Sequence, residues 1–292
     1  MEDYYWDEKL DYLKNTRDLY YNDDYLGFLV NSAWKISKPV HIIDFGCGYG
    51  YLGLKLLPLL PKGSRYTGID KGQKLINDAK KLFETLPYEA EFIVADVTEI
   101  ELESKYDIAV CHAFLLHMTD PIKMLQKMIH SVVNEGNIIC FEPHWISNMS
   151  SYHLSEYDQS EIMQLGFLQK LFEEDTKRNG KDGNIGIKLP TYLSKLGVKN
   201  IDCRVSDKVN FLDSNANQTD KQRLYDSLKE EGLGIAPAEK DEFLERLINR
   251  GATFNEANEQ YKAELRFSEV FNINSSLNYA PSMKITFGVV KK

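Results

Sequence analysis

The sequence predicts an α/β fold in which a mostly parallel sheet is flanked by helices. Short apolar runs rich in β-branched residues alternate with stretches of helical periodicity, which is typical of right-handed βαβ crossovers. A glycine-rich turn follows the first apolar run, and an acidic side chain stands at the end of each of the first three runs. Because the carboxyl ends of parallel strands meet at one edge of a sheet, these features predict a ligand site along that edge.

The length and composition suit a globular chain in a reducing compartment. The 292 residues suffice for one large α/β domain with insertions or for two small domains. No apolar run approaches the ~20 residues of a membrane-spanning helix. The N-terminus is acidic and aromatic, unlike a signal peptide. Cys47, Cys111, Cys140 and Cys203 form no C-x-x-C pair. We therefore expect a cytoplasmic protein with reduced thiols and no membrane insertion.

The charge balance argues against a nucleic-acid partner. The formal net charge is −9 at pH 7, and no large cluster of Lys or Arg occurs along the chain. A nucleic-acid binder needs a basic surface that faces the phosphates. The sequence therefore favours a small molecule as the partner.

The first predicted strand leads into the glycine-rich turn. An apolar run at residues 40–43 is followed by Asp44-Phe45-Gly46-Cys47-Gly48-Tyr49-Gly50 and then by the helix-forming residues 54–57. This order lets the backbone approach a ligand closely and points the free N–H groups of a helix start at it.

Two interpretations of this turn are open. Gly48, Gly50 and Gly53 satisfy G-x-G-x-x-G, a weak signal for a dinucleotide and hence for an NAD-dependent oxidoreductase. However, Asp44 precedes the first glycine, and a buried carboxylate without a partner is costly. The acid favours a ligand with a positive group, such as the amine of a methionine moiety.

The second and third predicted strands also end in acids. Asp70 closes the strand at residues 66–70 and comes 20 residues after Gly50, the spacing at which an acid reaches ribose hydroxyls. Its other interpretation is an N-cap of the helix that follows. Asp96 lies at the end of the third strand, where its carboxylate and the next amide could read adenine. Its other interpretation is a loop-initiating aspartate.

Further strands complete the predicted sheet. The fourth covers residues 106–112 and ends in His112, and a helix over residues 122–133 leads to the fifth strand at residues 136–143. A sixth strand is predicted at residues 197–205 and the last at residues 283–290. Asp44, Asp70, Asp96, His112 and Glu142 thus follow one another along the same edge of the sheet, which is the strongest sequence argument for a site there.

Five parts of the chain are expected. They are an N-terminal helical cap segment at 1–38, a cofactor-binding core at 39–143, a lid segment at 144–182, the remainder of the core sheet at 183–206 and 282–292, and a helical insertion at 207–281. An insertion after a strand's carboxyl end hangs over the ligand crevice. The lid and the N-terminal segment are rich in Tyr and Trp, which suits an apolar or aromatic small molecule.

Several of these motifs together carry a family resemblance. Asp44-Phe45-Gly46-Cys47-Gly48-Tyr49-Gly50, Asp70, Asp96-Val97 and Leu116-His117-Met118-Thr119-Asp120-Pro121 resemble successive motifs of class I S-adenosylmethionine-dependent methyltransferases of the UbiE-like small-molecule group. The resemblance implies a Rossmann-like, seven-stranded sheet whose last strand runs antiparallel between the fifth and the sixth. It also implies S-adenosylmethionine as the cofactor, S-adenosylhomocysteine as its product, and no required metal.

The resemblance assigns roles to individual residues. The cofactor-binding residues would be Asp44, Gly46, Cys47, Gly48, Gly50, Asp70, Lys71, Asp96, Val97 and His112. The glycine loop would contact the methionine portion, Asp70 the ribose, and Asp96 with the Val97 amide the adenine. His112 would stand beside the methyl-transfer site.

The chemistry of methyl transfer asks little of the protein. In-line displacement from a sulfonium needs alignment and exclusion of water, and an oxygen acceptor adds a need for a general base. The candidate catalytic residues are His112, His144 and Tyr152, with Glu142 as a further possible base. Each also has an ordinary structural interpretation. The acceptor atom stays open among O, N and C, and a non-catalytic cofactor-binding protein is a second alternative.

Overall fold

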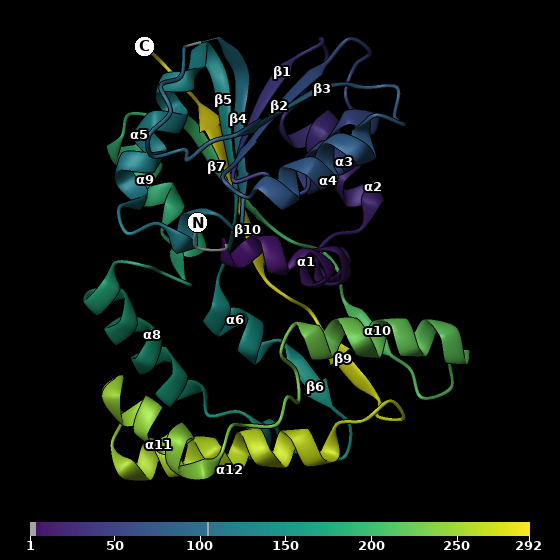
Figure 1. The fold of residues 1–292 in the computed structure, drawn as a ribbon, viewed down its shortest axis with the longest axis vertical. Helices are drawn as coiled ribbons and strands as arrows, with labels where there is room; N and C mark the ends of the chain where they lie inside the picture. Colours follow the sequence, from purple (N-terminus) through teal and green to yellow (C-terminus); the bar gives the residue numbers. More distant parts are fainter. Residues whose placement is uncertain (1–3, 104) are drawn as a thin grey trace.

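The computed structural model describes residues 4–103 and 105–292. Residues 1–3, which belong to the predicted N-terminal segment, and Ser104 lie outside the described residues. The main sheet has seven strands in the order β3-β2-β1-β4-β5-β10-β7 (Figure 1). Their bounds are β1 His41–Phe45, β2 Arg65–Asp70, β3 Glu89–Val94, β4 Tyr106–His112, β5 Val132–Pro143, β7 Lys199–Val205 and β10 Met283–Val289.

The sheet confirms the predicted fold class. The pairs from β3 to β5 are parallel, whereas β10 pairs antiparallel with both β5 and β7. The last strand therefore lies between the fifth and sixth strands of this sheet, as predicted. The boundary between α5 and β5 differs from the prediction, because β5 begins at Val132 and α5 ends at Ser131. The β-branched pair Val132-Val133 extends the strand rather than the helix. Strand β3 also ends at Val94, two residues before Asp96, and β7 begins at Lys199.

Helices cover both faces of the sheet (Figure 1). The helices α2 Asp23–Phe28, α3 Tyr51–Leu56 and α4 Gln73–Phe83 cover one face, and α5 Pro121–Ser131 and α9 Leu189–Lys195 cover the other. Successive residues of β1 point to opposite faces, so that Ile42 and Ile43 belong to two different apolar clusters. Burial on both faces explains the apolar runs of central strands such as β1, whereas the edge strands β3 and β7 are partly exposed.

The N-terminal segment crosses the carboxyl edge of the sheet. It contains a short 3₁₀ turn at Tyr5–Glu8, α1 at Leu10–Thr16 and, after α2, a π-helical turn at Leu29–Ala33. Helix α1 lies between the sheet and the lower part of the molecule, where it contacts α10 (Figure 1). The segment thus covers the edge at which a ligand site is predicted.

A second module lies below the main sheet (Figure 1). Its helices are α6 Trp145–Ser150, α7 Gln159–Ile162, α8 Leu165–Asn179, α10 Gln218–Glu230, α11 Lys240–Asn249 and α12 Phe254–Val270. A three-stranded antiparallel sheet of β6 Tyr152–Leu154, β9 Leu277–Tyr279 and β8 Asn210–Leu212 joins them. The sequence analysis did not find these three short strands, because three-residue strands show no measurable alternation.

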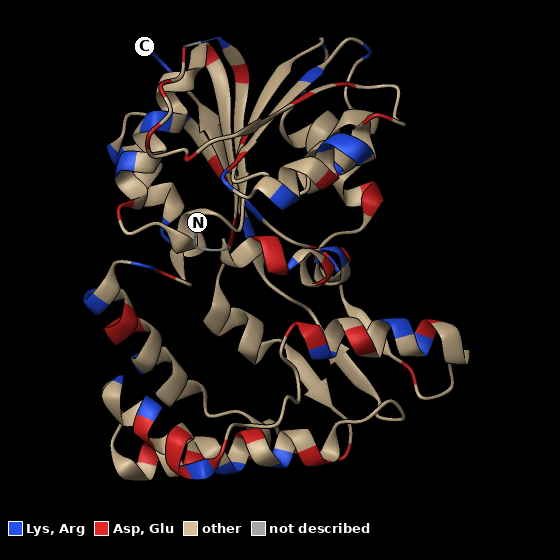
Figure 2. Ribbon diagram, viewed as in Figure 1, with Lys and Arg blue, Asp and Glu red and all other residues tan. Residues whose placement is uncertain are grey.

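The outer surface of this module carries both positively and negatively charged side chains. Figure 2 shows Lys and Arg interspersed with Asp and Glu along α10 and α12. None of the described helices has the length and apolar character that crossing a membrane requires. The charged faces of these helices are therefore solvated, and their apolar faces pack inward.

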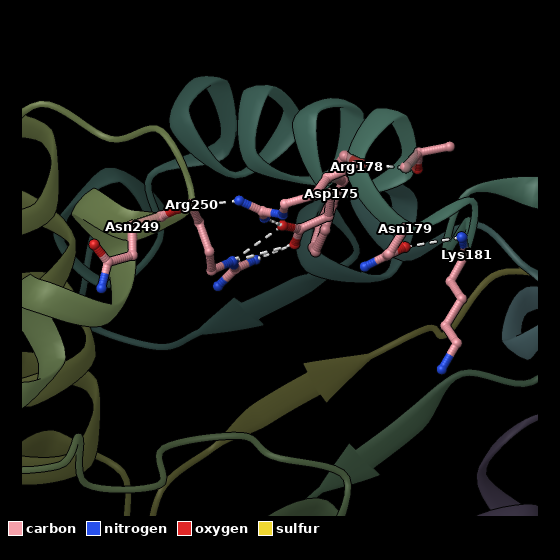
Figure 3. Close-up of polar contacts among 8 residues, drawn as sticks. Asp175, Arg178, Asn179, Lys181, Asn249 and Arg250 are labelled. Carbon is pink, nitrogen blue, oxygen red and sulfur yellow. Dashed lines mark hydrogen bonds and ion pairs between the residues drawn. The ribbon is translucent and has the colours of Figure 1, made fainter. Parts of the chain in front are cut away.

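Ion pairs connect helix α8 to the loop after α11 (Figure 3). We call the group of Asp175, Arg178 and Arg250 the clasp. The Asp175 carboxylate accepts hydrogen bonds from Arg250, at 3.1 Å from Nε and 2.7 Å from Nη2, and also pairs with Arg178. Arg178 in turn donates to the carbonyl of Asn249 at 3.0 Å. Beside the clasp, Leu171 of α8 and Phe243 of α11 belong to a small apolar cluster of their own.

We expect Arg250→Gln to lower the free energy of unfolding by ~0.5–1 kcal/mol, since a half-buried bidentate pair lies at the upper end of surface ion pairs. Hydrogen exchange should accelerate in α8 and not in β1 or β4. The control is Lys262→Gln, which removes an exposed pair with Glu259. Equal effects of the two substitutions would contradict the role of the clasp.

Candidate functional site

A cavity opens at the carboxyl edge of the main sheet, under the N-terminal segment. It is lined by most of the predicted cofactor-binding residues, which are Asp44, Gly46, Cys47, Gly48, Asp70, Lys71, Asp96, Val97 and His112. The N-terminal segment adds aromatic and basic walls, which are Tyr4, Trp6, Leu13 and Arg17. Gly50, His144 and Tyr152 do not line this cavity. The topology thus brings the ends of β1, β2 and β4 together around one space.

In the glycine turn, a side chain in place of a hydrogen of Gly46 or Gly50 would clash with neighbouring residues. Gly46 has φ +70°, and a Cβ built on it would lie 2.3 Å from Cδ2 of Phe114. Gly50 has φ +85° and is the N-cap of α3. The amides of Gly46 and Cys47 both donate to the Ile69 carbonyl, at 2.9 and 3.0 Å. The backbone is therefore held against β2, with no side chain between the Gly46 backbone and the ring of Phe114.

Asp44 has a buried carboxylate oxygen that no other described residue contacts through a hydrogen bond. Its side chain is 1% exposed, and Oδ2 accepts a hydrogen bond of 2.6 Å from the Tyr66 hydroxyl. Among the described residues, no donor reaches Oδ1. Burial raises the pKa of Asp44 to about 8, although the Tyr66 hydrogen bond opposes the rise. Such an oxygen calls for a donor, preferably a cationic one, from a bound molecule.

Asp70, the last residue of β2, is hydrogen-bonded to the glycine turn after β1. Its Oδ2 accepts from the Gly48 amide at 2.9 Å, and Oδ1 accepts from the Gly72 amide at 2.8 Å. Burial raises the pKa of Asp70, and these two amides oppose the rise. Asp70 does not cap α4, since Gly72 is the N-cap of that helix. Each carboxylate oxygen keeps a second lone pair that a hydroxyl in the cavity could use.

At the other end of the cavity, Asp96 is more exposed than Asp44 and Asp70. Oδ1 of Asp96 accepts from the Thr98 hydroxyl at 2.7 Å and from the Thr98 amide at 2.9 Å. The hydroxyl hydrogen bond lowers the pKa of Asp96. Lys71 lies 3.9 Å from Oδ2 of Asp96 and also over the ring of Tyr4. The side chain of Val97 is buried beside them. A carboxylate, an adjacent amide and aromatic walls together suit a flat heterocycle with an exocyclic amine.

His112 ends β4 and faces the cavity in a ring of aromatic side chains. Its Nε2 lies 3.2 Å from the Tyr21 hydroxyl, and the rings of Tyr51 and Phe141 lie 5.5 and 5.9 Å away. Burial, followed by the charge of Arg17, holds the pKa of His112 well below its usual value. The imidazole is therefore uncharged at neutral pH. The sequence did not single out Tyr21 as its partner, since the two are 91 positions apart.

Arg17 is a second residue that the sequence analysis missed. It lines the cavity from the 3₁₀ turn after α1, and none of the other described residues forms an ion pair or hydrogen bond with its guanidinium. A charged group at a cavity wall without a protein partner is available to an anionic group of a ligand. No local pattern marks this arginine in the sequence, because its position depends on how the N-terminal segment crosses the sheet.

The Glu142 carboxylate is hydrogen-bonded to three consecutive backbone amides. Its side chain is fully buried and accepts from the amides of Phe114, Leu115 and Leu116 at 2.9, 2.8 and 3.3 Å. Burial raises the pKa of Glu142 to about 7. The carboxyl group thus holds the turn that carries His117, whose ring contacts Trp6. It does not line the cavity.

The two other candidate catalytic residues lie in the second module. His144 is the N-cap residue of α6, and its Nδ1 lies 2.5 Å from the Ser147 hydroxyl. Tyr152 belongs to β6 and stacks on Phe267 at 5.5 Å between ring centroids. The structure therefore does not bring either residue together with His112. Their proximity to β5 in the sequence suggested a shared site, but after Pro143 the chain leaves the main sheet and enters the second module.

Comparison with known proteins agrees with this geometry. A family model described as "Methyltransferase domain" matches residues 36–232, about two thirds of the chain. The chain therefore belongs to this family. The described residues contain no group of three or more His, Cys, Asp or Glu placed to hold a metal ion.

Two curated relatives share part of the chain. A malonyl-[acyl-carrier protein] O-methyltransferase of Acetivibrio thermocellus is 32% identical over 119 residues, 41% of either chain. A ubiquinone biosynthesis O-methyltransferase of Colwellia psychrerythraea is 34% identical over 104 residues, 35% of this chain and 41% of the relative. The chain thus spans about two fifths of the length of these relatives.

A solved structure shares the fold. The YcgJ protein of Bacillus subtilis superimposes with a TM-score of 0.51 at 12% identity, covering 92% of this chain and 99% of that one. This similarity shows a shared fold. The matched family and the sheet order place the chain among the class I S-adenosylmethionine-dependent methyltransferases.

We expect Asp70→Ala to lower the free energy of unfolding by ~1–3 kcal/mol, because two buried amides lose their acceptor. Amide exchange at Gly48 and Gly72 should accelerate. Glu91→Ala, an exposed acid on the adjacent strand β3, is the matched control. Unchanged exchange at both amides in the Asp70 variant would contradict the proposed closure of the turn.

Proposed function

We propose that this protein transfers a methyl group from S-adenosylmethionine to a small-molecule acceptor. The observation that carries the proposal is the unpartnered, buried Oδ1 of Asp44 in a cavity at the carboxyl edge of a methyltransferase sheet. Within that cavity, the donor that best matches this oxygen is a ligand ammonium group, such as the amine of a methionine moiety.

The cavity residues fit the remaining parts of the cofactor. Arg17 is available for a carboxylate beside the amine that Asp44 would bind. Asp70 would accept from ribose hydroxyls, and Asp96 with the Val97 amide would read the adenine. The turn from Gly46 to Gly50 would contact the methionine portion with its backbone. A dinucleotide is less favoured, because Asp44 occupies the position where such strands remain apolar before the first glycine.

When bound, S-adenosylmethionine supplies an activated methyl group on a sulfonium. The protein's own contribution is alignment and the exclusion of water, which can account for much of the acceleration of an in-line displacement. Tyr4, Trp6 and Tyr51 line the cavity and limit the access of water. His112 and Tyr21 are proposed to lie beside the transfer site, where a neutral imidazole can accept a proton from the acceptor.

The cavity and one of the relatives support a proposal for the class of acceptor. The aromatic side chains around His112, among them Tyr51 and Tyr21, suit a largely apolar small molecule. The Colwellia relative is named as a ubiquinone biosynthesis O-methyltransferase, which supports an acceptor of this kind. We propose the same general class for this chain, with the acceptor atom an oxygen, nitrogen or carbon.

A binding experiment followed by an activity screen tests the function. Calorimetry should show binding of S-adenosylhomocysteine and none of NADH, and binding should raise the melting temperature with ligand concentration. Transfer of labelled methyl from S-adenosylmethionine into fractions of a metabolite extract should then reveal the acceptor. Binding of NADH without S-adenosylhomocysteine would overturn the proposal.

Asp44→Asn should weaken S-adenosylhomocysteine binding by about 10–100-fold, since a charged hydrogen bond is worth roughly 1.5–3 kcal/mol. The same substitution should stabilise the free protein at pH 8. Burial raises the Asp44 pKa to about 8, so ionising this group costs stability as the pH rises from its unfolded value near 3.9 toward 8. Calorimetry and urea denaturation at pH 6 and pH 8 measure the two effects. An Asn variant with unchanged affinity would exclude the role of Asp44.

An NMR titration checks the state of His112. Its imidazole should stay neutral from pH 8 down to pH 6.5 and titrate only below the usual value of about 6.5, because burial disfavours the charged form. The signal is assigned by its loss in His112→Asn. A midpoint at or above pH 6.5 would refute the neutral imidazole on which the proposed proton transfer rests.

A further inference from the structure

A second cavity lies in the lower module and has no assigned role. It is enclosed by α6, α8, β6, β9, α12 and the loop at residues 232–238, and it shares no lining residue with the cofactor cavity. Helix α1 borders both spaces, since Tyr12 lines the second cavity and Leu13 lines the first. The methyl-transfer proposal makes no use of this second cavity.

Three polar oxygens on its walls are buried and have no hydrogen-bond partner among the described residues. They are the hydroxyl of Tyr152, Oε2 of Glu231 and Oε1 of Gln260. They come from β6, the C-cap of α10 and α12, so three separate elements converge on one space. Tyr152 and Gln260 are 7% and 2% exposed, and Glu231 is half-buried as a residue although its Oε2 atom is buried. Buried oxygens are normally paired in folded proteins, so each of these requires an explanation.

Neighbouring groups fix these oxygens in position. The Tyr152 ring stacks on Phe267 at 5.5 Å. The other carboxylate oxygen of Glu231 accepts from the Tyr20 hydroxyl. The amide nitrogen of Gln260 donates to Glu264 at 2.8 Å, which leaves its carbonyl oxygen free. The three acceptors are therefore oriented before any ligand binds, which lowers the entropic cost of binding.

The walls and the charges define the complementary ligand. Apolar and aromatic side chains provide most of the remaining surface, among them Trp145, Met163, Leu168 and Phe172. All three unpartnered oxygens can accept hydrogen bonds, and Glu264 adds a second carboxylate to the same cavity. Arg246 also lines the cavity, but it is exposed and lies over the ring of Phe243.

We propose that this cavity binds an organic ammonium ion carried on an apolar or aromatic body, with the ammonium at Glu231, Gln260 and Tyr152. An ammonium group offers up to three donors, which matches three convergent acceptors. A carboxylate-bearing ligand would meet Glu231 and Glu264 instead. The inference stands apart from the methyl-transfer proposal, because it concerns binding at a separate cavity.

The protonation of Glu231 supports this choice of ligand. Burial raises the pKa of Glu231 to about 7, while the Tyr20 hydrogen bond and the charge of Arg17 oppose the rise. A cation beside Oε2 would favour the ionised carboxylate. The free protein thus holds a carboxylate that is costly to ionise until a positive group arrives.

The test uses three probes of similar size on the full chain. They are 2-phenylethylamine, the neutral 2-phenylethanol and the anionic 3-phenylpropanoate. At pH 7.5 we expect the amine to bind at least tenfold more tightly than the alcohol in calorimetry, and the anion not to bind. No binding of the amine, or equal binding of all three probes, would overturn the proposal.

Matched variants locate the binding. Glu231→Gln and Tyr152→Phe should each weaken amine binding at least fivefold, and Tyr152→Phe keeps the stacked ring. Glu245→Gln, an exposed acid on α11, should bind like wild type. Binding of S-adenosylhomocysteine, or the melting profile if that ligand fails, reports an intact fold in every variant. If Gln260→Leu, Tyr152→Phe and Glu231→Gln all bind the amine as wild type does, the assigned site is wrong.

Discussion

The two hydrogen bonds accepted by the Asp70 carboxylate hold the functional edge of this protein together. One reaches the Gly48 amide in the turn after β1, and the other reaches the Gly72 amide at the start of α4. A buried carboxylate is stable here because backbone N–H groups meet both of its oxygens. The cavity floor, the glycine turn and the first turn of α4 are thereby fixed relative to one another, and Asp44 is held facing the space between them.

The sequence predicted the main sheet well because its signals are local. The parallel strands contain short apolar runs, and a polar residue lies within two positions of the end of each of them, so both signals are visible without knowing the fold. The antiparallel position of β10 came from the family resemblance and is confirmed by its pairing with β5 and β7. The strands β6, β8 and β9 were missed because three residues give no period and their partners are more than 60 positions away along the chain.

The site residues also fall into two groups, those that local sequence signals predict and those whose position depends on distant segments. Residues at the carboxyl ends of strands, such as Asp44 of β1 and His112 of β4, line the predicted cavity. Arg17 was missed, and the contact of Tyr21 with His112 was not foreseen, because both depend on how a remote segment crosses the sheet. His144 and Tyr152 were placed beside His112 by their nearness to β5 in sequence, but the chain turns into the second module after Pro143. The polar atoms around Tyr152 instead face a cavity of their own.

The position of β10 has a consequence for how the protein is made. The strand lies between β5 and β7, yet the whole of residues 207–281 separates it from β7 along the chain. During synthesis, β5 and β7 therefore emerge long before the strand that joins them, and each presents an open edge of unsatisfied backbone groups. The nascent chain must keep these edges from pairing wrongly while the second module emerges. Completion of the sheet is thus a late, long-range event, the kind of step that slows folding and invites the help of chaperones.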